Sequence, residues 1–272
     1  MKEIKDVIGF IGAGNMATAL ISGLVNGSHS PSKIVASSPE DAHLDRLSKD
    51  HKIKTTKDNL DVVGLADIVI LAVKPNMIET VLEEIKEKIN ENDPLIVSIA
   101  AGVKIEKIET SINSPARIIR AMPNTPASIM EGVTAISPNN YVNKSDIAKA
   151  KLVFEHVGEV AEIKEKDIDI FTALIGSGPA YIFYLIESLL ESSDALELSK
   201  EEKIHLLSSM ISGAANLAKT SEDSPEILRK KVTSPGGVTQ KAIEEFESNN
   251  LKEMIKRTMQ EAEKKSIELG EN

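Results

Sequence analysis

A loop near the C-terminal end of the chain concentrates residue types that bind a small anion. It reads Val-Thr-Ser-Pro-Gly-Gly-Val-Thr over residues 232–239, between two segments with helical periodicity. Pro235 removes a backbone donor and two glycines open positive φ, so we expect a break between helices. A run of unshielded N–H groups near the start of a helix favours binding of a carboxylate. The alternative interpretation is an ordinary turn between two helices. The candidate anion-binding residues of the loop are Ser234, Gly236, Gly237 and Thr239.

A second pattern, close to the N-terminus, is typical of a dinucleotide site. A short apolar run ending at Ile11 leads into Gly-Ala-Gly-Asn-Met-Ala, residues 12–17. Gly12 makes the tight turn, Gly14 lets a pyrophosphate approach the backbone, and Ala17 takes the third, packing position. Because the motif follows an expected strand and opens an expected helix, it favours dinucleotide binding over a glycine-rich turn without a ligand.

The tip of the second expected strand bears on the choice between NAD and NADP. An acidic residue there holds the ribose 2′-hydroxyl and repels a 2′-phosphate. This chain reads Ala-Ser-Ser-Pro over residues 36–39, and hydroxyls tolerate the phosphate. The sequence therefore favours NADPH. NADH stays open, because Glu40 and Asp41 follow closely.

The chain lacks an obvious base for alcohol chemistry. Its five histidines fall in no motif, and the glycine-rich segment 173–181 contains no lysine. Hydride transfer to or from an alcohol usually needs such a group. A protonated imine is already electrophilic and needs mainly positioning, for which the Thr239 hydroxyl suffices. The alternative for Thr239 is a helix N-terminal residue whose hydroxyl bonds its own backbone.

Composition limits the classes of protein further. The chain has 272 residues, 41% of them hydrophobic, and a net charge of −10, which argues against nucleic-acid binding. It has no cysteine, which excludes disulfides and thiolate catalysis, and we expect no metal site. No signal peptide is expected at the charged N-terminus, and we find no apolar stretch of about 18 residues that would span a membrane. We expect a soluble cytoplasmic protein.

The first part of the chain alternates strand-like and helix-like segments. A helical pattern covers residues 16–24, and Pro75 opens another helix at a favoured position. Alternation of this kind predicts an α/β fold with a Rossmann-type, doubly wound parallel sheet. The expected strands cover residues 7–11, 33–36, 53–55, 67–73, 95–99 and 117–121.

The second part of the chain has only helical periodicity from Asp167 onward. Ser199 and Glu202 form a capping box at the start of one expected helix. We therefore expect a dinucleotide-binding domain over residues 1–163 and an all-helical domain over residues 164–272 for dimerisation and substrate binding. An apolar all-helical segment of this length often buries part of its surface against another copy of the chain.

Five motifs, in their order and spacing, resemble pyrroline-5-carboxylate reductases over nearly the whole chain. The resemblance implies NAD(P)H-dependent reduction of 1-pyrroline-5-carboxylate to L-proline, the last step of proline biosynthesis. It also implies a homodimer with interlocked helical domains, in which the Ser-Pro-Gly-Gly loop of one subunit, residues 234–237, completes the site of its partner, and larger rings of dimers. The motifs are residues 12–17, Leu-Ala-Val-Lys-Pro at 71–75, Arg-Ala-Met-Pro-Asn-Thr-Pro at 120–126, Ser-Gly-Pro-Ala-Tyr at 177–181 and Thr-Ser-Pro-Gly-Gly at 233–237.

The same resemblance implies roles residue by residue. Glu165 resembles a residue beside the substrate ring. Val238 and Thr239 resemble the substrate-binding pair, with Thr239 on the ring nitrogen. The cofactor-binding residues that the resemblance implies are Ile11, Gly12, Ala13, Gly14, Asn15, Met16, Ser38, Asn59, Ala72, Val73, Lys74, Pro75, Ile99, Ala100, Ala101 and Asn124.

Two other functions remain open from the sequence. One is a related NADP-dependent imine or keto-acid reductase, because a loop that accepts a small carboxylate fits both substrates. The other is a non-catalytic dinucleotide sensor or dimerising scaffold. The intact Ser-Pro-Gly-Gly-Val-Thr loop at residues 234–239 speaks against the scaffold, since a sensor needs no substrate clamp.

Overall fold

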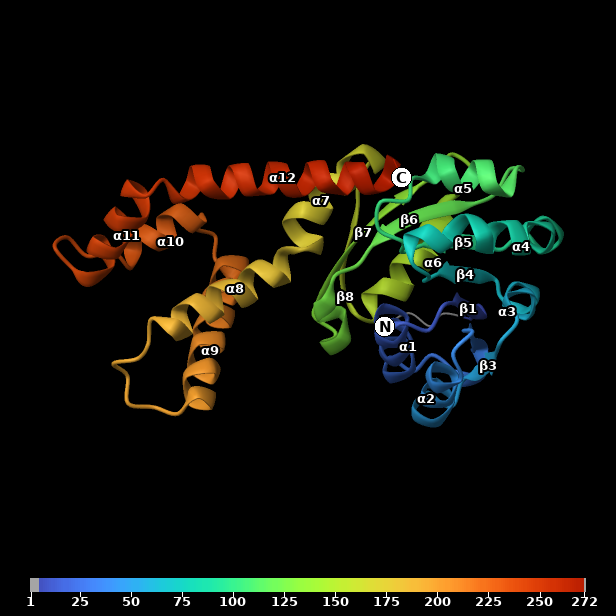
Figure 1. Cartoon of the computed structure of the whole chain (residues 1–272), viewed down its shortest axis with the longest axis horizontal. Coiled ribbons are helices and arrows are strands. Elements are labelled where there is room, and N and C mark those ends of the chain that lie inside the picture. The colour runs from blue at the N-terminus through green and yellow to red at the C-terminus, as the bar shows by residue number, and fades with distance from the viewer. Residues whose placement is uncertain (1–4, 272) are drawn as a thin grey trace. The chain divides into compact units, whose positions relative to one another are not determined.

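Eight strands form a single sheet in the order β3-β2-β1-β4-β5-β6-β7-β8 (Figure 1). The structure is a computed structural model and describes residues 5–271. The six strands from β3 to β6 pair in parallel, which confirms the expected Rossmann-type arrangement. The strands are β1 (Ile8–Ile11), β2 (Ile34–Ser37), β3 (Lys54–Thr56), β4 (Ile68–Leu71), β5 (Leu95–Ser98), β6 (Ile118–Met122), β7 (Gly132–Pro138) and β8 (Gly158–Glu162).

The sheet differs from the prediction at one edge. β7 runs antiparallel to β6, and β8 pairs in parallel with β7, so the sheet is mostly rather than wholly parallel, and the sequence did not predict these two strands. Only a loop and the 3-10 turn η3 (Thr125–Ile129) join β6 to β7. A parallel return needs a crossover of a dozen or more residues, usually a helix, and this connection is too short for one.

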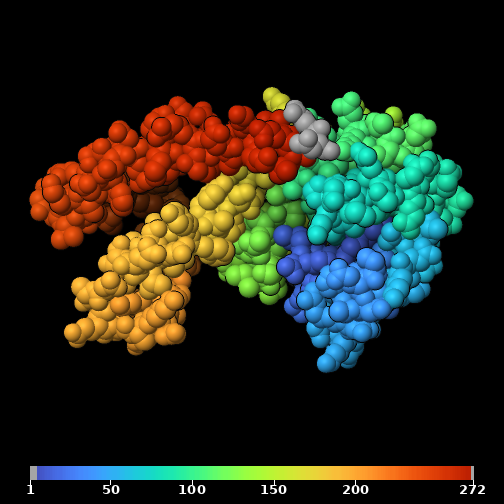
Figure 2. All heavy atoms as spheres, in the orientation of Figure 1, coloured from blue at the N-terminus to red at the C-terminus, as the bar shows by residue number. Residues whose placement is uncertain are grey.

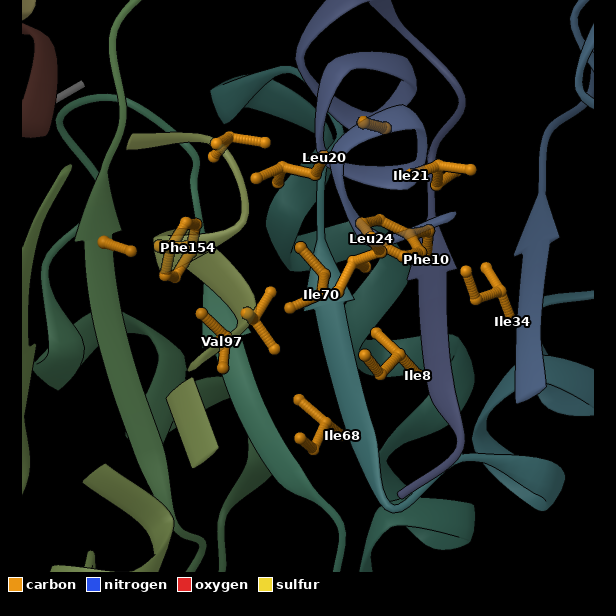
Figure 3. Close-up of a cluster of buried hydrophobic side chains, with 14 of the residues drawn as sticks. Ile8, Phe10, Leu20, Ile21, Leu24, Ile34, Ile68, Ile70, Val97 and Phe154 are labelled. Atoms are coloured by element: carbon orange, nitrogen blue, oxygen red, sulfur yellow. The ribbon is translucent and has the colours of Figure 1, made fainter. Parts of the chain in front are cut away.

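Helices cover both faces of the sheet. Successive residues of a strand point to opposite faces, and the residues on both faces are apolar. Ile8 and Phe10 of β1 face one buried cluster and Ile11 faces the other. In Figure 3 side chains of β1, β4 and β5 lie together with those of α1 and with Phe154 of α6. The opposite cluster contains α3, α4 and α5. The helices of this part are α1 (Asn15–Asn26), α2 (Asp41–His51), α3 (Asn59–Leu65), α4 (Ile78–Asn92), α5 (Ile105–Ile112), α6 (Lys144–Glu155) and α7 (Ile168–Phe171).

The chain divides into two compact units. One comprises the residues up to Ser177 together with those from Glu261 onward, and the other spans Gly178–Gln260. The segment from Glu165 to Ser177 belongs to the first unit, where Ile168 and Ala173 are buried. The functional domain boundary at residues 163/164 stays a prediction.

The second unit contains helices and no strand within Gly178–Gln260, all of which the structure describes. The chain colours of α8 to α11 run from yellow to orange-red in Figure 2. The expected capping box is confirmed: the Ser199 N–H donates to the Glu202 carboxylate at 2.9 Å, and the Glu202 N–H donates to the Ser199 hydroxyl at 3.2 Å. The Ser199 hydroxyl, which also donates to this carboxylate, holds the pKa of Glu202 below its ordinary value. The helices are α8 (Gly178–Glu191), α9 (Lys200–Thr220), α10 (Pro225–Lys231), α11 (Val238–Ser248) and α12 (Leu251–Glu271), the last of which continues into the first unit.

No residue between Gly178 and Gln260 is buried within the single chain. Large apolar side chains are exposed there, including Phe183 at 63% and Tyr184 at 71%. By length and composition alone, the helical stretch Glu165–Glu191 is apolar enough to cross a membrane, so the expectation that no such stretch exists was wrong. Apolar helix faces that are exposed in a single chain are also typical of surfaces that another protein chain covers.

Candidate active site

The loops that follow the parallel strands meet at the carboxyl edge of the sheet. In open α/β sheets, ligands bind outside this edge, where the strand order reverses. Here the order reverses between β1 and β4, which are neighbours in the sheet although they are not consecutive in the chain. The glycine motif follows β1 and residues 72–75 follow β4, so the first two candidate cofactor segments lie side by side.

Gly12 and Gly14 of the motif have different surroundings, so a side chain at each position would have a different effect. Gly12 has φ +100°, and an added Cβ would lie 2.5 Å from the Ala72 carbonyl oxygen. An added Cβ at Gly14 would meet no atom within 4 Å. Gly12 is therefore required by the fold itself, whereas Gly14 borders open space.

Open space at Gly14 coincides with an exposed helix start. Gly14 caps α1 without a side-chain hydrogen bond, and the first turn of the helix has no acidic residue. Backbone N–H groups and the positive end of the helix dipole are thus available to an anion. A pocket of about 490 Å³ opens beside this helix start, with Asn15, Met16 and Thr125 in its wall. The arrangement fits a dinucleotide pyrophosphate.

Gly14→Val is expected to weaken NADPH binding at least tenfold without destabilising the apoprotein, because its side chain would fill space that the pyrophosphate needs. Gly12→Ala is the matched comparison and should lower the melting temperature of the apoprotein, since its Cβ collides with Ala72. Titration by NADPH fluorescence and thermal unfolding without cofactor measure the two effects. Equal NADPH affinities of the Gly14→Val variant and the wild type would refute the phosphate cradle.

Ser38 and Asn59 lie at neighbouring ends of β2 and α3. Ser38 is 4% exposed, and its hydroxyl accepts the Glu40 N–H at 3.2 Å. The hydroxyl of Ser37, which the sequence analysis left out, donates to Asn59 Oδ1 at 2.6 Å. Asn59 Nδ2 donates to a carboxylate oxygen of Glu84 at 3.0 Å. Asn59 is therefore held in place by its neighbours at this edge.

The ends of β4 and β5 bring the remaining candidate cofactor residues to the same edge. The Ala72 N–H donates to the Ile11 carbonyl at 2.8 Å, and the Ile99 N–H donates to Leu71 at 3.1 Å. Lys74 and Pro75 are exposed, and Pro75 begins a 3-10 turn, η2 (Pro75–Met77), directly before α4. Val73 and Ala101 are half-buried, and Ala100 is buried.

Glu165 belongs to a polar cluster that sequence reasoning missed. One of its carboxylate oxygens, Oε1, accepts the Ile105 N–H at 2.7 Å and lies 3.4 Å from Arg120. Arg120 is 3% exposed and also lies 3.5 Å from Asp169, which accepts a hydrogen bond from Ser266 at 2.8 Å. The available signal was a charged residue inside the apolar strand Ile-Ile-Arg-Ala-Met.

Asn124 is buried at the end of β6 and is bonded to other segments of the chain. It is 6% exposed, and its side chain bonds Val133 and Ile175. Its neighbour Thr125 is exposed and opens η3. Whether Asn124 contacts the cofactor stays a prediction.

The loop at residues 232–239 joins α10 to α11 in the second unit. The Gly236 N–H donates to the Gln240 side chain at 2.6 Å, and the Gly237 N–H donates to the Ser234 carbonyl at 3.0 Å. The expected run of unshielded glycine N–H groups was therefore wrong. Gly236 has a positive φ of +70° and lies in a tight turn. The Ser234 carbonyl and the Gln240 side chain accept the glycine N–H groups of this turn.

Open donors lie one step further along, at the start of α11. Gly237 caps this helix without a side-chain hydrogen bond, and Val238 and Thr239 occupy its first two positions. The first N–H groups of a helix have no partner inside the helix. Thr239 is exposed, and its hydroxyl bonds no other residue between 5 and 271, unlike the Thr233 hydroxyl, which donates to the Arg229 carbonyl at 2.6 Å. The alternative in which Thr239 bonds its own backbone is thus not what the structure has.

The described part of the chain contains no cluster of side chains that could ligate a metal ion. Between residues 5 and 271, no group of three or more His, Asp or Glu side chains is placed to hold an ion.

Comparison with known proteins relates both parts of the chain to one family. A family model described as NADP oxidoreductase, coenzyme F420-dependent, matches residues 7–102. A second model, pyrroline-5-carboxylate reductase dimerisation, matches residues 165–269. A pyrroline-5-carboxylate reductase of Synechocystis sp. is 36% identical over 264 residues, which are 97% of this chain and 98% of the relative.

Solved structures agree over the whole length. A pyrroline-5-carboxylate reductase from Coxiella burnetii superposes with a TM-score of 0.91 at 38% identity and covers 98% of this chain and 99% of its own. The Plasmodium falciparum pyrroline carboxylate reductase, solved with NADP bound, gives a TM-score of 0.89 at 31% identity over 99% and 100% of the two chains. With identities of 31 to 38% over 97 to 99% of its length, the chain belongs to the pyrroline-5-carboxylate reductase family.

Proposed function

We propose that this protein reduces 1-pyrroline-5-carboxylate to L-proline, with NADPH as the hydride donor. The observation that carries the proposal is the free start of α11, where the Thr239 hydroxyl and the first backbone N–H groups have no partner of their own. This set suits a substrate with a ring nitrogen and a carboxylate. Membership of the family supports the same substrate.

The residues of the chain divide the task between binding and positioning. NADPH supplies the hydride when it is bound. Its pyrophosphate is held by the backbone of the motif at residues 12–14 and by the start of α1, with Asn15 and Met16 following. Ser38 and Asn59 serve the adenosine end, and the loops at residues 72–75 and 99–101 line the nicotinamide end.

The substrate residues act by orientation. Thr239 holds the N–H of the imine, while the Val238 N–H and the other free N–H groups at the start of α11 hold the carboxylate. The turn at Ser234, Gly236 and Gly237, whose glycine N–H groups are already bonded, sets the position of this helix start. Glu165 lies beside the substrate ring: both of its protein contacts use Oε1, which leaves Oε2 for the substrate. Positioning of this kind supplies much of the barrier reduction when the acceptor is already electrophilic.

We further propose that the active form is a homodimer in which the Ser-Pro-Gly-Gly loop of one subunit, residues 234–237, completes the site of its partner. The match to a dimerisation family over residues 165–269 supports this assembly. So does the second unit itself, which buries no residue within one chain. Rings of several dimers and a cytoplasmic location are part of the same proposal.

The direct test is oxidation of NADPH by purified protein with pyrroline-5-carboxylate as substrate, with NADH in parallel. We expect turnover with both nucleotides and a higher kcat/KM with NADPH. Binding of NADPH without turnover on this substrate would overturn the proposal. Turnover on other cyclic imines or keto acids would then identify a related reductase, and no turnover at all would identify a dinucleotide sensor.

A further inference from the structure

The side chain of Asn124 links two segments that are far apart in the sequence. Its Oδ1 accepts the N–H of Val133 in β7 at 2.8 Å, and its Nδ2 donates to the carbonyl of Ile175 at 3.1 Å. The residue is 6% exposed. A buried amide that is bonded at both ends is fixed in direction and costly to remove. Asn124 therefore fastens the segment containing Ile175 to the loop after β6.

Ile175 lies in an irregular helical turn. Residues Thr172–Gly176 are π-helical, and the Ser177 N–H donates to the Thr172 carbonyl, five residues back, at 2.8 Å. Turns of this kind are rare and occur often at functional sites. Along the chain this turn lies between Glu165, the proposed substrate contact, and Gly178, where the second compact unit begins.

The sequence explains why the Ile175 carbonyl takes a donor from another segment. In an α-helix this oxygen accepts the N–H of the residue four positions later. That residue is Pro179, which has no N–H and whose ring crowds the carbonyl four residues before it. The Asn124 amide supplies a donor where the helix has lost one.

We propose that Asn124 is a positioning residue, whose amide replaces the hydrogen bond that Pro179 cannot make and so holds the π-helical turn at the carboxyl edge of the sheet. This inference rests on the proposed reductase function. Asn124 acts through the turn on the segment from Glu165 to Ser177. In this role the side chain works through its two backbone partners, Val133 and Ile175, rather than through a bond to the cofactor.

The first test is Asn124→Ala. Since a displacement of about 1 Å in a positioning group costs up to about a hundredfold in rate, we expect kcat/KM for pyrroline-5-carboxylate to fall by about that factor. NADPH affinity, measured by NADPH fluorescence, should change less than about threefold. Hydrogen exchange at the Ser177 amide should become faster, because the π-helical turn opens more often.

A matched control is Asn139→Ala. Asn139 also bonds the backbone at both ends: it accepts from Ile118 at 3.2 Å and donates to Ala116 at 2.9 Å. These contacts lie at the amino end of β6, at the edge opposite the site. Asn139→Ala should therefore lower the melting temperature and leave kcat/KM within about threefold of the wild type.

The decisive experiment is a double variant that restores the backbone N–H missing at position 179. In Asn124→Ala/Pro179→Ala, residue 179 regains an N–H that can bond the Ile175 carbonyl within the helix. We expect slower exchange at Ser177 and at least a tenfold recovery of kcat/KM relative to Asn124→Ala, since coupled positions are non-additive. If Asn124→Ala does not fold, Asn124→Asp replaces it, because it keeps the acceptor for Val133 and loses the amide donor when ionised.

The outcomes separate the possible roles. Faster exchange at Ser177 that Pro179→Ala reverses supports the proposal, and unchanged exchange overturns it. A loss of NADPH affinity as large as the loss of kcat/KM also overturns it, because Asn124 would then be a cofactor contact. If the wild type does not reduce pyrroline-5-carboxylate, the proposed function fails, and the exchange measurements still decide whether Asn124 holds the turn.

Discussion

Replacing Thr239 by valine should lower kcat about a hundredfold, the loss typical of removing one donor that is aimed at the reacting group. Valine keeps the shape of threonine and removes only the hydroxyl that has no partner within residues 5–271. The NADPH dissociation constant should stay within about threefold of the wild-type value, because the cofactor cradle lies at α1. Steady-state kinetics with varied pyrroline-5-carboxylate and a fluorescence titration of NADPH measure the two quantities.

Two further variants make the Thr239 experiment specific. Thr239→Ser retains a hydroxyl and should recover most of the rate. Thr233→Val removes a hydroxyl of the same loop that already donates to the Arg229 carbonyl at 2.6 Å, so it should cost stability more than rate. Equal rate losses for Thr239→Val and Thr233→Val, or an unchanged kcat/KM in Thr239→Val, would remove Thr239 from the reaction.

Arg120→Met should cause the largest loss of stability. Arg120 is 3% exposed and lies between the carboxylates of Glu165 and Asp169 at 3.4 and 3.5 Å. Removing one partner of a buried ion pair costs about 3 to 5 kcal/mol, because the remaining charge is left without compensation. The distances are long and Glu165 is partly exposed, so we expect the lower end, about 3 kcal/mol, and a melting temperature about 6 to 12 °C lower.

An exposed ion pair provides the comparison for Arg120. Lys151 and Glu162 are 2.8 Å apart with side chains 35% and 41% exposed, so Lys151→Met should cost less than about 1 kcal/mol. Adding Asp169→Asn to Arg120→Met should recover part of the stability, because it removes one of the two stranded charges. Differential scanning calorimetry of the four proteins tests this reasoning. Equal melting temperatures for Arg120→Met and Lys151→Met would show that the buried cluster contributes no more than a surface pair.

The sequence predicted elements best where the pattern is strong and local. The strands around Phe10, Val69 and Val97 carry continuous apolar runs, and the Ser199–Glu202 capping box fixes a helix start through bonds within one turn. β8 was missed because its sequence, Gly-Glu-Val-Ala-Glu, is short and half polar, as befits a strand at the edge of the sheet. The antiparallel turn into β7 was missed because strand direction follows from how the chain returns, which the pattern of one strand does not contain.

The sequence alone was enough to predict the types of residue available for chemistry, the Rossmann order of the first strands and the helical character of the second part. Which hydrogen-bond donors are free depends on how the chain folds. In the loop at 232–239 the glycine N–H groups are taken by Ser234 and Gln240, while the start of α11 stays open. The same holds for Arg120 and Asn124, whose partners lie tens of residues away. Donors and acceptors are paired in the folded structure, often between residues far apart in the sequence. The sequence therefore identifies the candidate donors, and the fold determines which of them remain free to bind a ligand.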